Sequence, residues 1–343
     1  MKRLLNTLYV TSPDRYLSLD GENVVVLSEG EEVGRVPLHN LEAIVTLGFA
    51  GASPALMGAC AKRNVALSFL SRSGRFLARV SGECRGNVLL RKKQYFLSED
   101  TEGRLDIAKS FIIGKLFNGR WVLERATRDH AMRVDVEHLK LVSGRLKNAM
   151  EAVQTCNSME TLRGIEGEAA SLYFSVFDEL ILQQRETFSF QGRNRRPPLD
   201  EINALLSFTY TLLANMTASA LETVGLDPYV GFLHTDRPGR ASLALDLMEE
   251  LRPVYADRFV LSLINKRIVS PSGFFRKENG AVIMDDDTRK AVLSAWQTRK
   301  QETIKHPFLE VKVEWGMAAY TQALLLARYI RGDLDAYPPF MWK

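Results

Sequence analysis

Short apolar runs separated by glycine turns occupy the first part of the chain. Strands are predicted at residues 16–19, 23–27, 33–36, 43–47, 65–70 and 75–80. Asp20-Gly21 and Glu29-Gly30 are turn signals between the first three of these strands. Ser53 before Pro54 combines an N-cap residue with a proline at the first helical position, and predicts a helix over residues 54–62. The pattern predicts a small sheet domain with one or two helices.

The hydrophobic period changes after Gly86 from that of strands to that of helices. Helices are predicted at residues 106–127, 132–152, 158–185, 201–223, 242–251, 255–266, 287–302 and 312–331. We therefore predict an α+β protein. Its parts are a β-rich domain at residues 1–86, a linker at residues 87–105, and a larger all-α helical bundle at residues 106–343.

Composition places the chain among ordinary globular proteins, because 46% of its 343 residues are apolar and 25% are charged. No apolar run approaches the roughly 20 residues that cross a bilayer, and no secretion signal is apparent. We expect a cytoplasmic protein with no membrane contact. The three cysteines, Cys60, Cys84 and Cys156, are odd in number and irregularly spaced, which disfavours a disulfide framework or a zinc ribbon.

Positive charge is concentrated in one part of the chain. The net charge is +4, whereas residues 85–128 alone carry ten Lys or Arg and five acids. A basic stripe of this kind suits a phosphate backbone, whose counterions lysine and arginine displace. A solvated surface with scattered charges is the alternative.

Candidate chemistry lies between residues 231 and 253. His234 sits in a loop punctuated by glycine and proline, and Asp246 and Glu249 follow on a predicted helix. Their spacing of three puts both carboxylates on one helical face. Glu166 lies on an apolar stripe of an earlier helix, where an unpaired buried carboxylate is costly. It needs a metal, or a salt bridge to an arginine such as Arg163.

Two or three carboxylates with one imidazole bind Mg²⁺ or Mn²⁺. They leave coordination positions open for a phosphodiester. The imidazole nitrogen favours Mn²⁺ over Mg²⁺. We predict that Glu166, His234 and Glu249 hold the metal and that Asp246 either binds it too or orients His234. These four residues are the predicted catalytic set. The predicted DNA-binding residues are Arg91, Lys92, Lys93, Lys115, Arg240 and Arg252.

Three motifs, at residues 164–173, 196–210 and 234–253, resemble those of one family, the Cas1 endonucleases and spacer integrases of CRISPR adaptation. The resemblance covers essentially the whole chain and looks closest to members that accompany type I systems. It implies a metal site of Glu166, His234 and Glu249, with Asp246 at a further acidic position. It also implies that a 3′-hydroxyl of a short prespacer duplex attacks a phosphodiester at the edge of the CRISPR repeat.

The same resemblance implies partners. A homodimer built through the N-terminal domains is expected, and two such dimers are expected to sandwich a dimer of the small protein Cas2. The ligand is then double-stranded DNA, both prespacer and repeat. Two other functions stay open from the residues alone: a non-catalytic nucleic-acid-binding scaffold, and a metal-dependent phosphoesterase of small substrates.

Overall fold

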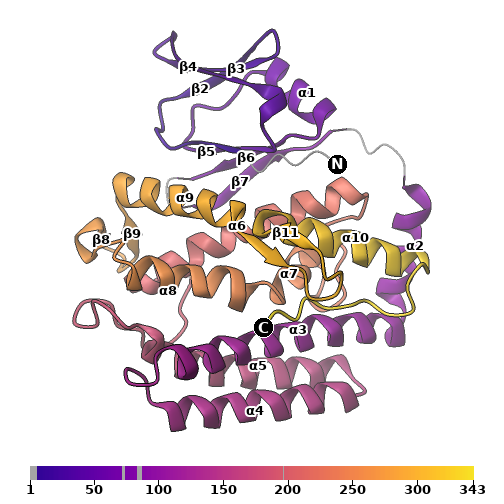
Figure 1. The fold of residues 1–343 in the computed structure, drawn as a ribbon. Coiled ribbons are helices and arrows are strands. Elements are labelled where there is room, and N and C mark those ends of the chain that lie inside the picture. The colour runs from indigo at the N-terminus through magenta and orange to yellow at the C-terminus, as the bar shows by residue number, and fades with distance from the viewer. Residues whose placement is uncertain (1–5, 72–73, 83–86, 196) are drawn as a thin grey trace. The chain divides into compact units, whose positions relative to one another are not determined.

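The computed structural model describes residues 6–71, 74–82, 87–195 and 197–343 (Figure 1). Cys84, Arg85 and Arg196 therefore lie outside the described residues. The chain divides into two compact units. The first comprises Met1–Arg85 and Met284–Gln301, and the second comprises Gly86–Ile283 and Glu302–Lys343.

Two sheets build the first unit. One is antiparallel, in the order β2 (Tyr16–Asp20), β3 (Asn23–Ser28) and β4 (Glu31–Pro37). The other is mixed, in the order β1 (Thr7–Val10), β5 (Ala43–Leu47), β6 (Ala66–Leu70) and β7 (Phe76–Val80). Strands β1, β5 and β6 run parallel, and β7 is antiparallel to β6. The six predicted strands are all present, and β1 is an addition at the sheet edge.

Both sheets contribute to one core. Leu17 and Val24 of the antiparallel sheet pack in the same cluster as Ile44 and Leu67 of the mixed sheet, together with Leu56 of helix α1 (Pro54–Arg63). Helix α1 begins as predicted, because the Ser53 side chain accepts a hydrogen bond from the backbone of Leu56.

Helix α9 (Asp286–Gln301) belongs to this unit although it comes late in the chain. The Lys300 ammonium lies 2.9 Å from the Thr7 hydroxyl and 3.0 Å from a Glu42 carboxylate oxygen. These contacts attach the end of the helix to the mixed sheet, a pairing that no local pattern in the sequence predicts.

The second unit is mainly helical. It contains α2 (Val88–Glu99), α3 (Thr101–Asp129), α4 (Val136–Thr155), α5 (Met159–Ser175), α6 (Glu201–Val224), α7 (Ser242–Glu249), α8 (Arg258–Asn265) and α10 (Ala318–Arg331). Side chains at positions 100, 135, 158 and 200 cap four of these helices. Helices α3, α4 and α5 pack side by side, and α6 packs against α7 and α10 (Figure 1).

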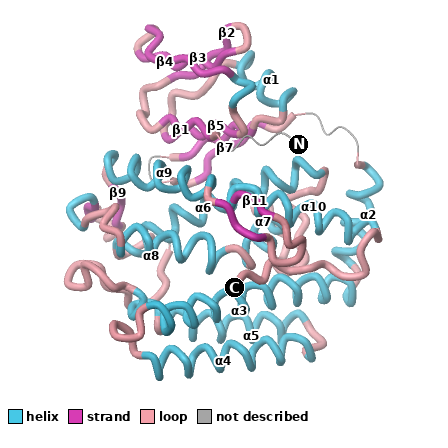
Figure 2. The backbone as a smooth tube through the Cα atoms, in the orientation of Figure 1, coloured by secondary structure: helices cyan, strands magenta, loops and turns pink. Residues whose placement is uncertain are grey.

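Three expectations need correction. The segment expected as a linker, residues 87–105, forms α2 and the start of α3, because its apolar positions recur at helical spacing. The bundle is not all-α, since β8 (Phe274–Arg276) pairs with β9 (Val282–Met284) and β10 (Thr303–Lys305) pairs with β11 (Lys312–Glu314) (Figure 2). The predicted helix at residues 158–185 ends at Ser175 and gives way to the 3₁₀ turn Phe177–Leu180.

Helix α6 is the one described helix that is long and apolar enough to cross a membrane by composition, and 61% of its most apolar window is buried inside the molecule. Burial of this kind is typical of the core helix of a globular domain. Helix α7 is followed by a π-helical turn, Arg252–Asp257, which leads directly into α8. Such turns often occur at functional sites, and this one lies three residues beyond Glu249.

Candidate metal centre

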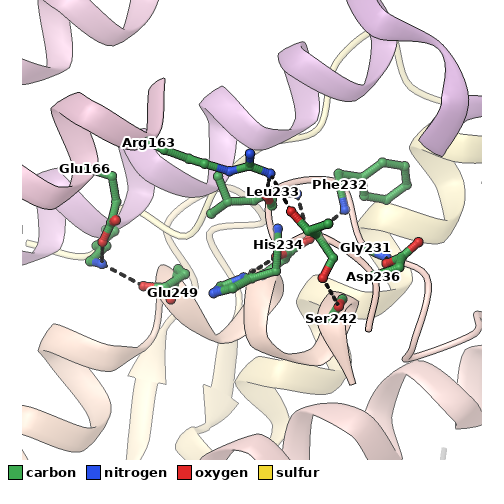
Figure 3. Close-up of polar contacts among 12 residues, drawn as sticks. Arg163, Glu166, Gly231, Phe232, Leu233, His234, Asp236, Ser242 and Glu249 are labelled. Atoms are coloured by element: carbon green, nitrogen blue, oxygen red, sulfur yellow. Dashed lines mark hydrogen bonds and ion pairs between the residues drawn. The ribbon is translucent and has the colours of Figure 1, made fainter. Parts of the chain in front are cut away.

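Asp246 holds the His234 loop in place. Its Oδ2 accepts hydrogen bonds from the backbone N–H of Phe232 (2.6 Å) and Leu233 (2.9 Å). Its Oδ1 accepts from the His234 backbone (2.9 Å) and lies 2.6 Å from His234 Nδ1 (Figure 3). Asp246 is fully buried, and both of its oxygens are occupied. This geometry favours the orienting role for Asp246, because Nδ1 of His234 faces the carboxylate and Nε2 is the ring nitrogen that remains for a metal.

Glycine is required at position 231, where the loop passes helix α7. A Cβ at Gly231 would lie 2.7 Å from Cβ of Ser242 and 2.8 Å from Oδ2 of Asp246. Both are closer than side-chain carbons approach other atoms. The absence of a side chain therefore lets the loop reach the Asp246 carboxylate.

Arg163 of helix α5 supports the same loop from the other side (Figure 3). Its Nη2 donates to the Leu233 carbonyl (2.7 Å) and to the Thr235 hydroxyl (3.2 Å). The expected alternative partner of Glu166 was an arginine such as Arg163. Arg163 instead contacts the loop, and Glu166 pairs with Lys115.

Glu249, at the end of α7, is buried and lies between two cations. Its Oε1 is 2.9 Å from Nη1 of Arg252, and its Oε2 is 2.8 Å from Nζ of Lys115. The same Lys115 ammonium contacts Oε1 of Glu166 on α5. Glu166 and Glu249 are therefore joined through one positive charge supplied by helix α3 (Figure 3).

The charges in this cluster support one another. Burial alone would raise the pKa of Glu249, but Arg252 and Lys115 outweigh it and lower that pKa to about 2. Burial acts on Lys115 in the opposite sense, and Glu249 and Glu166 outweigh it to raise the lysine pKa. Both carboxylate and ammonium are therefore charged at neutral pH.

The donor chemistry fits Mg²⁺ or Mn²⁺. Among the described residues, no three acidic, histidine or cysteine side chains are grouped closely enough to hold an ion as they stand. Lys115 occupies the gap between two of the predicted ligands. An ammonium in that gap shows that the two carboxylates accommodate a cation, and the His234 ring points toward Glu249 (Figure 3). Two carboxylates and an imidazole nitrogen are ligands that Mn²⁺ accepts readily.

Some of the predicted DNA-binding residues are accessible to DNA, and others are engaged in contacts within the protein. Lys92 is exposed and Arg91 partly exposed on α2, where they remain accessible to a phosphate. Lys93 donates to the Arg331 carbonyl (2.8 Å) and so caps the end of α10. Lys115 is largely buried against carboxylates, so its predicted role of following the DNA backbone does not agree with its position.

Arg252 and Arg240 lie nearer to the candidate centre. Arg252 pairs with Glu249, and its guanidinium lies 5.1 Å from the ring centre of Tyr210. Arg240 has a buried Nε without a hydrogen-bond partner among the described residues. Burial, together with the nearby charges of Arg237 and Arg163, lowers the pKa of Arg240. These arginines repel one another, and an anion bound between them would relieve that repulsion. Their arrangement therefore favours an anion beside the His234 loop.

The sequence did not predict the network around Glu250. This buried carboxylate accepts from the Tyr337 hydroxyl (2.6 Å), the Gln322 amide (2.8 Å) and the Phe340 backbone (2.9 Å). Burial raises its pKa to about 7 despite those bonds. The C-terminal tail thus folds back onto the residue next to Glu249.

Asn118 completes this attachment. Its Nδ2 donates to the carbonyls of Glu250 and Phe340, at 2.6 Å each, and its Oδ1 accepts from the backbone of Trp342 at 2.9 Å. A Cβ at Gly114, one turn earlier on α3, would lie 2.8 Å from Glu250 Cβ. Gly114 is a local sign of this close approach.

A β-rich unit precedes a helical unit in which two carboxylates share one ammonium and an imidazole is fixed on a loop. Arg240 of the same loop has a buried Nε without a hydrogen-bond partner among the described residues. This is the arrangement expected of an enzyme that acts on phosphodiesters. The model of the family "CRISPR associated protein Cas1" matches residues 8–298. The chain belongs to this family of CRISPR-associated endonucleases, as the three sequence motifs indicated.

Two curated relatives match over the full length of both chains. "CRISPR-associated endonuclease Cas1 2" of Rhodospirillum rubrum is 53% identical, and "CRISPR-associated endonuclease Cas1 1" of Chlorobaculum tepidum is 50% identical. The solved Cas1 protein of Thermotoga maritima has a TM-score of 0.82 at 21% identity, covering 97% of this chain and 98% of that one. A chain of a Cas6-RT-Cas1–Cas2 complex has a TM-score of 0.84 at 22% identity, covering all of this chain and 36% of that one. The predicted fold class, a β-sheet region followed by a mostly helical domain, is confirmed.

Proposed function

We propose that this endonuclease joins the 3′-hydroxyl ends of short prespacer DNA to a CRISPR repeat, with Glu166, His234 and Glu249 holding one Mn²⁺ or Mg²⁺. The observation that carries the proposal is the cation position between Glu166 and Glu249, next to an imidazole fixed by Asp246. When bound, the ion supplies Lewis-acid chemistry, polarising the phosphodiester and stabilising charge on the leaving oxygen.

The protein's own residues bind and orient the reactants. The bond between phosphorus and the 3′-oxygen of the repeat strand breaks as the prespacer 3′-oxygen forms its own bond to phosphorus, and the hydroxyl proton ends on the leaving oxygen. Arg240, whose buried Nε has no hydrogen-bond partner in the described part of the chain, is suited to a non-bridging phosphate oxygen beside the His234 loop. Arg91 and Lys92 on α2 are suited to phosphates further along the duplex.

The proposed partners are a second copy of this chain, paired through the N-terminal domain, and the small protein Cas2. A structural neighbour with this fold is part of a Cas1–Cas2 assembly, which supports the second partner. A cytoplasmic location is also proposed. The described cysteines, Cys60 and Cys156, are free and buried, which suits a reducing compartment.

A strand-transfer assay tests the proposal. Purified protein is mixed with Cas2, Mn²⁺ or Mg²⁺, a short duplex with free 3′-hydroxyls and a plasmid that carries the repeat. Glu166→Gln and His234→Ala should abolish joined product while leaving DNA affinity nearly unchanged, because lysine and arginine supply that affinity. Glu168→Gln is the matched control, an exposed carboxylate two positions further along the same helix.

Joining by the Glu166→Gln variant at the wild-type rate would refute the assigned centre. A steep salt dependence of DNA binding without saturable Mn²⁺ binding would favour the non-catalytic scaffold. Turnover of free nucleotides without any dependence on DNA would favour the small-molecule phosphoesterase.

A further inference from the structure

Lys115 occupies the position in which the proposed function requires a metal ion. Its ammonium comes from α3 and contacts Glu166 on α5 and Glu249 on α7. Only 14% of the Lys115 side chain is exposed, and only 4% of the Glu249 side chain. The Glu166 side chain is 29% exposed, so the shared cation is shielded from water on the Glu249 side and partly open to it on the Glu166 side.

We propose that Lys115 is a resident counter-cation, which keeps Glu166 and Glu249 together in the metal-free protein and must leave the gap before a divalent ion enters. The proposal rests on the proposed function, because it takes Glu166 and Glu249 as metal ligands. It makes Lys115 a positioning residue that sets the affinity of the site for metal.

Electrostatics requires some cation between these side chains. Two carboxylates facing one gap repel each other, and the repulsion is strong where water is excluded. The Lys115 ammonium removes that repulsion in the metal-free state. A divalent ion must therefore compete with the Lys115 ammonium for the same two carboxylates, and this competition weakens its binding.

Lys115 is better suited to leave than Arg252, the other cation on Glu249. Arg252 is held from two directions, since it pairs with Glu249 Oε1 at 2.9 Å and lies over the Tyr210 ring at 5.1 Å. The ammonium of Lys115 is carried on a flexible four-carbon chain. Among the described residues, its polar partners are the two carboxylates themselves.

The test is direct titration of full-length, metal-stripped protein with Mn²⁺, following the free ion by electron paramagnetic resonance. Lys115→Met and Lys115→Gln should bind Mn²⁺ at least tenfold more tightly than wild type, because the carboxylates lose their internal competitor. Lys115→Arg keeps the charge and should show no such gain. Lys109→Met removes a lysine from the more exposed side of the same helix and should match wild type.

Circular dichroism checks that each variant is folded. Should Lys115→Met fail to fold, Lys115→Gln keeps a polar group in the gap, and its Mn²⁺-dependent rise in melting temperature measures the same affinity. Equal or weaker Mn²⁺ binding by the folded Met and Gln variants would overturn this inference while leaving the metal centre intact. Absence of saturable Mn²⁺ binding in wild type and variants alike would overturn the metal centre as well.

Discussion

Asp246→Asn is the substitution that separates the orienting role of this residue from a ligand role. Asn has nearly the same shape as Asp, but only one of its two terminal atoms accepts hydrogen bonds. Asp246 accepts from three backbone N–H groups and one imidazole nitrogen, at 2.6–2.9 Å. In the variant, an amide NH₂ must face two of those four donors.

The expected cost follows from those contacts. A hydrogen bond to a charged acceptor contributes about 1.5–3 kcal/mol, so loss of two predicts about 3–6 kcal/mol of destabilisation in this fully buried position. For a unit of this size, that corresponds to a fall in melting temperature of roughly 10 °C. The His234 ring also loses the carboxylate that fixes its orientation, so Mn²⁺ affinity should fall roughly 10- to 100-fold.

Differential scanning calorimetry and Mn²⁺ titration measure the two effects on the same samples. Asp236→Asn is the matched control, because Asp236 is exposed on the same loop and accepts one bond, from Gly231 at 3.2 Å. That variant should change either quantity little, since its amide oxygen can still accept. If Asp246→Asn melts at the wild-type temperature and binds Mn²⁺ as tightly as the wild type, the reasoning is refuted.

Three further predictions concern residues around this centre. Gly231→Ala should destabilise the protein by about 1–3 kcal/mol in denaturant unfolding, because its Cβ overlaps Ser242, and an unchanged midpoint would contradict the clash. Burial raises the pKa of Asp257 from 3.8 to about 6, so the folded protein holds a proton that the unfolded chain has lost, and stability falls as pH rises through that window. Relative to Asp257→Asn, wild type should therefore lose about 2 kcal/mol between about pH 4.5 and about pH 7, and parallel profiles would refute this. Tyr337→Phe removes a 2.6 Å bond to Glu250 and should lower the melting temperature more at pH 8, where that carboxylate is ionised, than at pH 6; equal losses would count against the bond.

Local sequence patterns were enough to define most of the secondary structure elements. Alternating apolar residues and the turns at Asp20-Gly21 and Glu29-Gly30 defined the first hairpins, since β3 pairs with β2 and β4 across those turns. Ser53 and Pro54 marked the start of α1, and helical spacing marked most of the bundle. These signals are local, so neighbouring residues are enough to show them.

The candidate site was predictable only in part. The spacing of Asp246 and Glu249 placed both acids on one helix, and the glycines and prolines around His234 indicated a loop. The backbone N–H groups at positions 232–234 decide that Asp246 orients His234 and that Glu249 faces a cation. Their contact with Asp246 becomes visible only when the loop folds against α7.

Which charged side chains pair with one another became visible only in the folded molecule. Lys115 precedes Glu166 by 51 positions and Glu249 by 134, yet one ammonium joins them. Lys300 likewise reaches Glu42, which brings α9 into the N-terminal unit. A charge has no periodicity that reveals its partner, because an ion pair depends on distance in space. The lysine that looked like part of a DNA-binding stripe is therefore paired with two carboxylates, and only the packing of α3 against α5 and α7 could show it.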